Sequence, residues 1–210
     1  MPKFRKISGR LFAVTAVVLG ITLGVGLALN GPFVELWIGA KFYAGNDYNL
    51  LLGLATVASA VGFTLLEVLF ATGNIRRPAI AQLAQTIVRI GLLFALVPVV
   101  GILSIPLSML ITEVLGGVVY MALEWKRTLS VPGSELFRQF LISVRALVVA
   151  TVMVIVWQWL PYPGTWPALF AHGAFFGASI MLAFYLAEPF VRSKVNELAA
   201  SFWRFAMIRR

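Results

Sequence analysis

The sequence predicts an all-α integral membrane protein, a bundle of six transmembrane helices, and two observations lead to this class. The first is composition: 60% of the 210 residues are hydrophobic and 12% are charged, whereas soluble domains average about 45 to 50% apolar and about 25% charged residues. The second is spacing, because uncharged runs of 24, 19, 23 and 42 residues follow Arg10, Asp47, Arg89 and Arg145. In lipid, runs of this length form helices, which satisfy their own backbone hydrogen bonds.

Helix-breaking residues divide these runs into spans. Residues 161–164 (PYPG) split the longest run in two, because two prolines and a glycine form a turn. Pro78 marks a helix start, and the stretch from Gly101 to Pro106 predicts a tight hairpin. The six expected spans cover residues 11–30, 49–71, 79–99, 104–124, 143–160 and 167–187. They form a single membrane domain over residues 1–210, in which the first span is retained because no signal-peptide cleavage site follows it.

The basic residues indicate how the bundle is oriented. With six spans, fifteen of the seventeen Lys and Arg residues fall on one side of the membrane. The two exceptions are Lys41, on the opposite side, and Arg89, within a span. The positive-inside rule therefore predicts a multi-pass protein with both termini in the cytoplasm. This placement explains the net charge of +9 without nucleic acid as a partner.

Residues 188–210 are predicted to form a basic amphipathic cytoplasmic tail. Its apolar stripe comprises Val191, Val195, Leu198, Phe202 and Phe205. The basic side chains of the tail are then available to anionic membrane lipids. The alternative is that these residues only set the topology of the last span.

No pattern typical of an enzyme is found in the sequence. Cysteine is absent, and the single histidine, His172, cannot bind a metal ion alone. Glycine-rich phosphate loops, Ser/His/Asp sets and paired catalytic acids have no convincing match. We therefore expect no cofactor, no metal site and no enzymatic activity.

Three charged residues are expected within spans: Glu67, Arg89 and Glu113. Each costs about 2.5 to 3.5 kcal/mol on insertion scales and so needs an explanation. Arg89 and Glu113 lie at matching depths of about 15 Å in antiparallel neighbours, which predicts an ion pair. Glu67 lies nearer the cytoplasmic end. The two glutamates take part either in ion coupling or in structural pairing, with Glu67 then reaching toward Arg76 or Arg77.

A polar stripe on the third span supports a functional role for its arginine. Gln82, Gln85, Thr86 and Arg89 recur at helical spacing and so share one face. This face is predicted to line a hydrated substrate cavity, because a guanidinium beside amides suits a phosphate or pyrophosphate. The alternative is that Arg89 only joins two helices.

Milder polar stripes occur on the first two spans. They comprise Thr15, Thr22, Gly26 and Asn30 on the first, and Gly53, Thr56, Thr64 and Glu67 on the second. Small and hydroxylated residues are typical of helix packing in lipid, so packing is the favoured interpretation for both.

Three short stretches resemble a known family. They are residues 33–39 (FVELWIG), 71–77 (ATGNIRR) and 100–106 (VGILSIP). In this order they resemble the C-terminal half of Wzx-type polysaccharide-biosynthesis flippases of the MOP exporter superfamily. The matching features are a Trp-x-Gly motif, a Gly-x-x-Arg loop and a glycine-containing outer hairpin. Ser104 departs from the pattern, since a second glycine is common at that position of the hairpin.

The resemblance implies one lobe of a MOP-type transporter in the cytoplasmic (inner) membrane. Such a lobe carries undecaprenyl-pyrophosphate-linked oligosaccharide, a polysaccharide or O-antigen precursor, to the outer leaflet by alternating access. Family members have twelve to fourteen spans, so a missing N-terminal lobe or a second copy of the chain is an expected partner.

Two other functions remain open from the sequence. One is half of a drug or lipid exporter of the same superfamily. The other is a non-transporting scaffold for a polysaccharide assembly complex. The polar stripe of the third span favours transport, because a scaffold needs no water-lined face.

Overall fold

The computed structural model describes residues 2–129, 141, 148, 152, 163–187, 191–193, 195–197 and 200. Side chains of residues 2–10, 13, 129 and 187 are not described. The predicted span 143–160, apart from residues 148 and 152, and most of the predicted tail, including Leu198, Phe202 and Phe205, lie outside the described residues.

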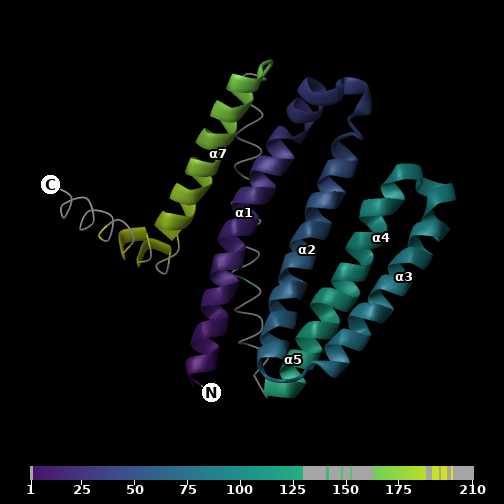
Figure 1. Ribbon diagram of the computed structural model, residues 1–210, viewed down its shortest axis with the longest axis vertical. Helices are drawn as coiled ribbons and strands as arrows, with labels where there is room; N and C mark the ends of the chain where they lie inside the picture. The colour runs from purple at the N-terminus through teal and green to yellow at the C-terminus, as the bar shows by residue number, and fades with distance from the viewer. Residues whose placement is uncertain are drawn as a thin grey trace.

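The described residues contain helices and no strand. The helices are α1 (Pro2–Ile38), η1 (Ala40–Phe42), α2 (Asn46–Ala71), α3 (Arg76–Val100), η2 (Gly101–Leu103), α4 (Ser104–Thr112), η3 (Glu113–Tyr120), α5 (Met121–Leu129) and α7 (Trp166–Ala187). Four segments of the described chain are long and apolar enough to cross a membrane: Val14–Ile38, Asn46–Ala71, Arg76–Thr128 and Trp166–Leu186. The 53-residue third segment turns back on itself at η2, so α3 packs against α4 (Figure 1).

The long helices lie side by side in the order α7, α1, α2, α4 and α3 (Figure 1). The N-terminus, the turn between α2 and α3, and α5 lie at one end, here called the lower end. The η1 segment, the η2 turn and the start of α7 lie at the upper end. The described part of the chain therefore contains five passes between the two ends.

Two hydrophobic clusters hold the bundle together. One joins α1 to α7 and contains Phe176, Ile180 and Phe184. Val191, from the predicted tail, is buried in the same cluster. The other cluster joins α1, α2, η3 and α5, and there the Phe12 and Trp125 rings lie 6.0 Å apart between centroids.

Glycines allow α2 and η3 to approach closely. A Cβ on Gly62 would lie 2.9 Å from the backbone of Gly117, a separation that real Cβ atoms do not tolerate. Small residues at such contacts are typical of helix packing in membranes, where apolar burial supplies little driving force. The glycine pair therefore sets the spacing between α2 and the η3 segment.

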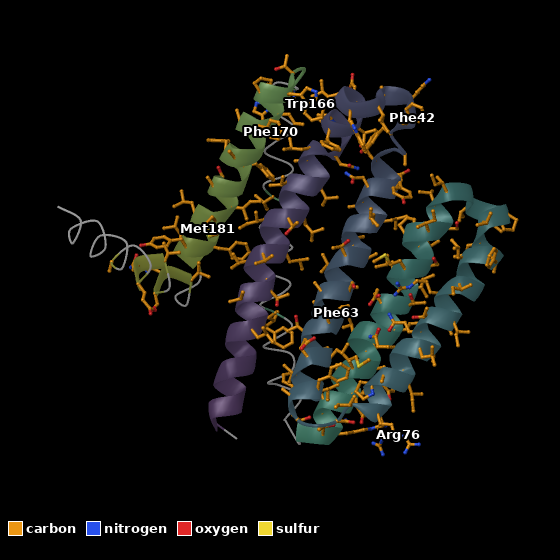
Figure 2. The ribbon with its side chains drawn as sticks, in the orientation of Figure 1. Phe42, Phe63, Arg76, Trp166, Phe170 and Met181 are labelled. Carbon is orange, nitrogen blue, oxygen red and sulfur yellow. The ribbon has the colours of Figure 1, made fainter. Side chains whose placement is uncertain are left out.

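The surface of the bundle is apolar as a membrane requires. In the most hydropathic window of Arg76–Thr128, only 11% of the residues are buried inside the protein. Leu83, Ile87 and Phe94 of α3 are more than half exposed, and Phe63 of α2 and Met181 of α7 also project outward (Figure 2). Exposed apolar side chains along helices of this length are typical of helices that cross a membrane.

The first helix is longer than the predicted span 11–30. It continues through Gly31 and Pro32 to Ile38, because Pro and Gly are tolerated in membrane helices whose neighbours stabilise them. Gly39 ends the helix with a φ of 99°, a conformation that other residues rarely adopt. The predicted spans 49–71, 79–99 and 167–187 agree with α2, α3 and α7 to within three residues at each end.

The fourth predicted span, 104–124, is not a regular α-helix. It comprises α4, an eight-residue π-helix (η3) and α5, which ends at Leu129. Gly116 and Gly117 lie in the π-helix, and glycine lowers the barrier to non-α backbone geometry. A π-helical turn shifts the direction of the side chains that follow it and is frequent at functional sites.

Candidate functional site

Arg89 of α3 forms an ion pair with Glu113 at the start of η3. One guanidinium nitrogen, Nη2, donates to Glu113 Oε1. The Arg89 Nε donates to Thr112 Oγ1 at 3.0 Å. The Thr112 hydroxyl in turn lies 2.9 Å from the Ser108 carbonyl oxygen, to which it donates. The ion pair predicted from matching depths is therefore present, and Thr112 is a partner that depth arguments alone missed.

The environment of the pair explains its geometry. The Glu113 side chain is 10% exposed and the Arg89 side chain 32% exposed. A Cβ on Gly117 would lie 2.6 Å from Glu113 Oε2, so the absent side chain leaves room for the carboxylate. Paired charges at this depth neutralise each other, whereas removal of one partner leaves an uncompensated buried charge.

The other residues of the predicted α3 stripe differ in their burial and in their contacts. Gln85 is 7% exposed, and its amide nitrogen and oxygen have no hydrogen-bond partner among the described residues. A Cβ on Gly116 would lie 2.7 Å from Gln85 Oε1, so this amide packs directly on the π-helix. Thr86 is exposed and donates to the Gln82 carbonyl oxygen of its own helix at 2.9 Å. Gln85 and Arg89 thus face the adjacent η3 segment, while Thr86 does not.

Glu67 lies near the lower end of α2. It is exposed on α2, and no salt bridge joins it to Arg76 or Arg77 within the described structure. The Arg77 Nη1 atom lies 3.4 Å from Glu124 Oε1. The choice between ion coupling and structural pairing for Glu67 stays a prediction. The turn between α2 and α3 packs against α5 at the lower end, and this places Arg77 over α5.

Glu124 was not among the residues predicted to be functional. It is 1% exposed and lies between the guanidinium groups of Arg77 and Arg127, the latter 3.7 Å away. Asn74 Nδ2 donates to Glu124 Oε1 at 3.1 Å and lies 2.9 Å from Thr128 Oγ1. The signal for this cluster was Glu124 three residues before Arg127, on one helix face.

A cavity lies between α1, α2 and α7 in the upper half of the bundle. Its volume is about 580 Å³, within the range of about 300 to 1,000 Å³ typical of ligand sites. Its polar side chains are Thr22 and Asn30 from α1 with Asn49 and Thr56 from α2, and its aromatic ones are Phe33 and Phe170. Figure 2 shows Phe170 near the upper end of α7. We call this space the upper cavity.

Some residues of the α1 and α2 polar stripes, which the sequence assigned to helix packing, line the upper cavity. Thr15 and Thr64 do pack, with their hydroxyl oxygens 3.2 Å apart. Thr22, Gly26 and Thr56 instead line the upper cavity, and a Cβ on Gly26 would meet nothing within 4 Å. The packing interpretation is right for Thr15 and Thr64, and also for Gly53, on which a Cβ would lie 2.9 Å from Leu27 Cδ2 of α1. Thr22, Gly26 and Thr56 are the residues of the two stripes for which the cavity offers another role.

The two asparagines of the cavity are held in place. Asn30 Nδ2 donates to Asn49 Oδ1 at 3.1 Å, and Asn49 Nδ2 donates to the Leu27 carbonyl oxygen at 3.1 Å. Amides held in fixed positions at the wall of a mostly apolar cavity offer oriented hydrogen-bonding groups to a polar ligand. Asn49 lies in the first turn of α2, where sequence periodicity gave no reason to select it.

Within the part of the chain that the structure describes, no three acidic or histidine side chains gather as metal ligands. Comparison of the chain with protein-family models, with curated proteins and with solved structures finds no match. The family resemblance of the sequence therefore stays a prediction.

Proposed function

We propose that the chain is a six-helix lobe of a membrane transporter. In this proposal it flips an undecaprenyl-pyrophosphate-linked oligosaccharide across the cytoplasmic membrane by alternating access, together with a second lobe or a second copy of the chain. Both termini lie in the cytoplasm. The proposal combines the family resemblance with the polar groups found at membrane depth.

The observation that carries the proposal is the upper cavity. Polar side chains within a membrane are costly and are usually placed toward the bundle interior or a water-filled space. The Thr22 and Thr56 hydroxyls donate to carbonyls of their own helices, which leaves their lone pairs free to accept from a ligand. Together with the asparagine amides and the Phe33 and Phe170 rings, they suit a sugar, which offers many hydroxyls and apolar ring faces.

The geometry changes the role proposed for Arg89. A guanidinium already paired with Glu113 and Thr112 attracts an anion less than an unpaired one, because its charge is compensated. We therefore assign the contact with the sugar to the upper cavity. The Arg89 and Glu113 pair joins α3 to η3, so that the hairpin moves as one unit during alternating access.

The distribution of charge supports the proposed orientation. Arg76 and Arg77 begin α3 at the lower end (Figure 2), where Lys126 and Arg127 of α5 also lie. The N-terminus, near four basic residues of the sequence, is at the same end (Figure 1). Such an excess of basic residues is typical of the cytoplasmic side.

Single-cysteine labelling tests the cavity directly, because the chain has no cysteine of its own. Cysteines at Gly26 and Thr56 should react with a membrane-impermeant maleimide in sealed vesicles. Cysteines at Leu83 and Ile87, exposed on α3, are the matched lipid-facing controls and should not react. A cysteine at Gln82 tests the alternative that the α3 stripe is hydrated.

A transport measurement tests the substrate contact. In cells that carry the chain in its native context, Thr22→Val with Thr56→Val should lower the amount of lipid-linked oligosaccharide that reaches the outer leaflet. Thr86→Val is the matched control, because Thr86 makes the same bond to its own helix outside the cavity. The reverse result, with only Thr86→Val impaired, would move the substrate path to α3. Normal transport in the double variant at normal abundance would contradict the proposal.

A further inference from the structure

A second hollow lies between α3 and the α4–η3 segment, in a different part of the bundle from the upper cavity. Its volume is about 690 Å³. Most of its lining is apolar, as in Ile80, Ala84, Val88, Leu92, Ile111 and Leu115, and Arg77 also lines it. We call this hollow the α3–η3 groove.

The groove is longer than the hydrocarbon part of one membrane leaflet. Its α3 lining runs from Arg77 to Leu92, which at about 1.5 Å per residue corresponds to about 22 Å. Half of the hydrocarbon core of a bilayer measures about 15 Å. A lipid whose phosphate lies at the lower end can therefore place an acyl chain along the groove.

The charge at the lower end of the groove selects among lipids. The Arg77 side chain is 69% exposed, and among the described residues only its Nη1 is engaged, by Glu124. Its Nε and Nη2 donors are available to a phosphate. Residues 72–77 and 121–128 together contain four basic side chains and one acidic one, and that one, Glu124, is buried. One carboxylate cannot compensate four basic side chains, so the entrance to the groove keeps an excess of positive charge.

The groove faces the part of the protein most exposed to lipid. Ile80 and Val88, which line it, are 58% and 54% exposed. Leu83 and Ile87, on adjacent faces of α3, are exposed as well. Since α3 lies at one end of the row of described helices (Figure 1), bilayer lipid reaches the groove directly.

From this geometry we propose that the α3–η3 groove binds one anionic glycerophospholipid, with its phosphate at Arg77 and an acyl chain between α3 and η3. The occupant is a resident lipid of the leaflet at the lower end, distinct from any transported substrate. A neutral lipid fills the apolar part equally well but leaves the positive entrance without a counter-charge. This inference requires membrane insertion of the bundle and does not require transport.

Native mass spectrometry of the full chain, released from nanodiscs of equal parts phosphatidylglycerol and phosphatidylcholine, measures the bound lipid. The wild-type chain should retain one phosphatidylglycerol in preference to phosphatidylcholine. Arg77→Gln should lower this preference about fivefold, the effect of one basic side chain near an anionic headgroup. Arg77→Lys should keep most of the preference, because the charge remains.

A second variant leaves the ion pairs intact. Ala84→Phe fills the groove and should abolish retention of the lipid, whereas Ala95→Phe, on an exposed part of α3 outside the groove, should not. If Arg77→Gln fails to fold because Glu124 loses a partner, the comparison of Ala84→Phe with Ala95→Phe still tests whether the groove binds the lipid. Equal retention by Ala84→Phe and Ala95→Phe would overturn the proposal. Stronger retention of undecaprenyl phosphate than of phosphatidylglycerol, at equal fractions, would also overturn the glycerophospholipid as occupant.

Discussion

The α3–η3 contact and the upper cavity both hold polar side chains at membrane depth, yet they use them differently. At the α3–η3 contact, Arg89 and Glu113 neutralise each other and Gln85 is packed against Gly116. In the upper cavity, Thr22 and Thr56 bond to carbonyls of their own helices and, among the described residues, to no other helix. The difference shows that a polar stripe at helical spacing marks either an internal contact or a ligand-accessible wall, and that the neighbouring helix decides which.

The largest expected effect comes from breaking the charge pair. Arg89→Ala leaves Glu113 buried without a counter-charge, and we expect a loss of about 3 kcal/mol in the free energy of unfolding. The double variant Arg89→Gln with Glu113→Gln should lose less, because no charge remains. Unfolding by SDS titration in bicelles measures both. Additive effects in the double-mutant cycle built from Arg89→Gln, Glu113→Gln and the double variant would refute the coupling.

A pair of glycine substitutions compares a contact with a cavity wall. Gly62→Ala places a Cβ 2.9 Å from the Gly117 backbone and should cost about 1 to 3 kcal/mol through overpacking. Gly26→Ala meets nothing within 4 Å and should gain up to about 1 kcal/mol in helix propensity. Thermal unfolding followed by circular dichroism in detergent distinguishes them. Equal melting temperatures for the two variants would contradict the assigned packing.

A substitution at Gln85 is expected to raise the stability of the protein rather than to lower it. Its buried amide has no partner among the described residues, and an unsatisfied buried polar group costs about 1 to 3 kcal/mol. Gln85→Met, which keeps the length of the side chain, should therefore raise the melting temperature. Thr86→Val, exposed on the same helix, is the control and should change it little. A lower melting temperature for Gln85→Met would show that the amide has a stabilising partner.

The smallest effect separates the two threonines of α2. Thr64 bonds to Thr15 across the α1–α2 contact, so Thr64→Val should cost about 0.6 kcal/mol, the average for hydrogen bonds between membrane helices. Thr56→Val removes no bond to another helix and should leave stability unchanged. The same SDS titration measures both variants. A larger loss of unfolding free energy for Thr56→Val than for Thr64→Val would mean that Thr56 packs against another helix and does not line an open cavity.

The sequence predicted the helices better than their ends. Uncharged runs and proline positions located α2, α3, α7 and the η2 hairpin, because lipid forces each apolar run into a helix. The same information could not place the end of α1 at Ile38, since Pro32 is a helix breaker in water and is tolerated between packed membrane helices. It also could not predict the π-helix η3, whose geometry depends on the contacts of Gly116 and Gly117 with α3 and α2.

The candidate site was predicted in part for the same reason. The depths of Arg89 and Glu113 follow from residue counts, because the rise of a helix is constant, and their ion pair was predicted correctly. For Glu67 the sequence left ion coupling and structural pairing open. It gave no sign that Glu124 would contact Arg77, because which of two acids meets Arg77 depends on how the α2–α3 turn packs on α5. Asn49 was missed because its role requires Leu27 and Asn30 of another helix.

The sequence by itself determined that this protein is helical, apolar on its surface and asymmetric in charge, since these properties follow from local composition and from the cost of exposing backbone groups to lipid. Only the tertiary structure decided which polar side chains pair and which line the upper cavity. The reason is that every polar residue inside a membrane needs a partner or water, and the identity of that partner is set by the crossing of helices distant in sequence.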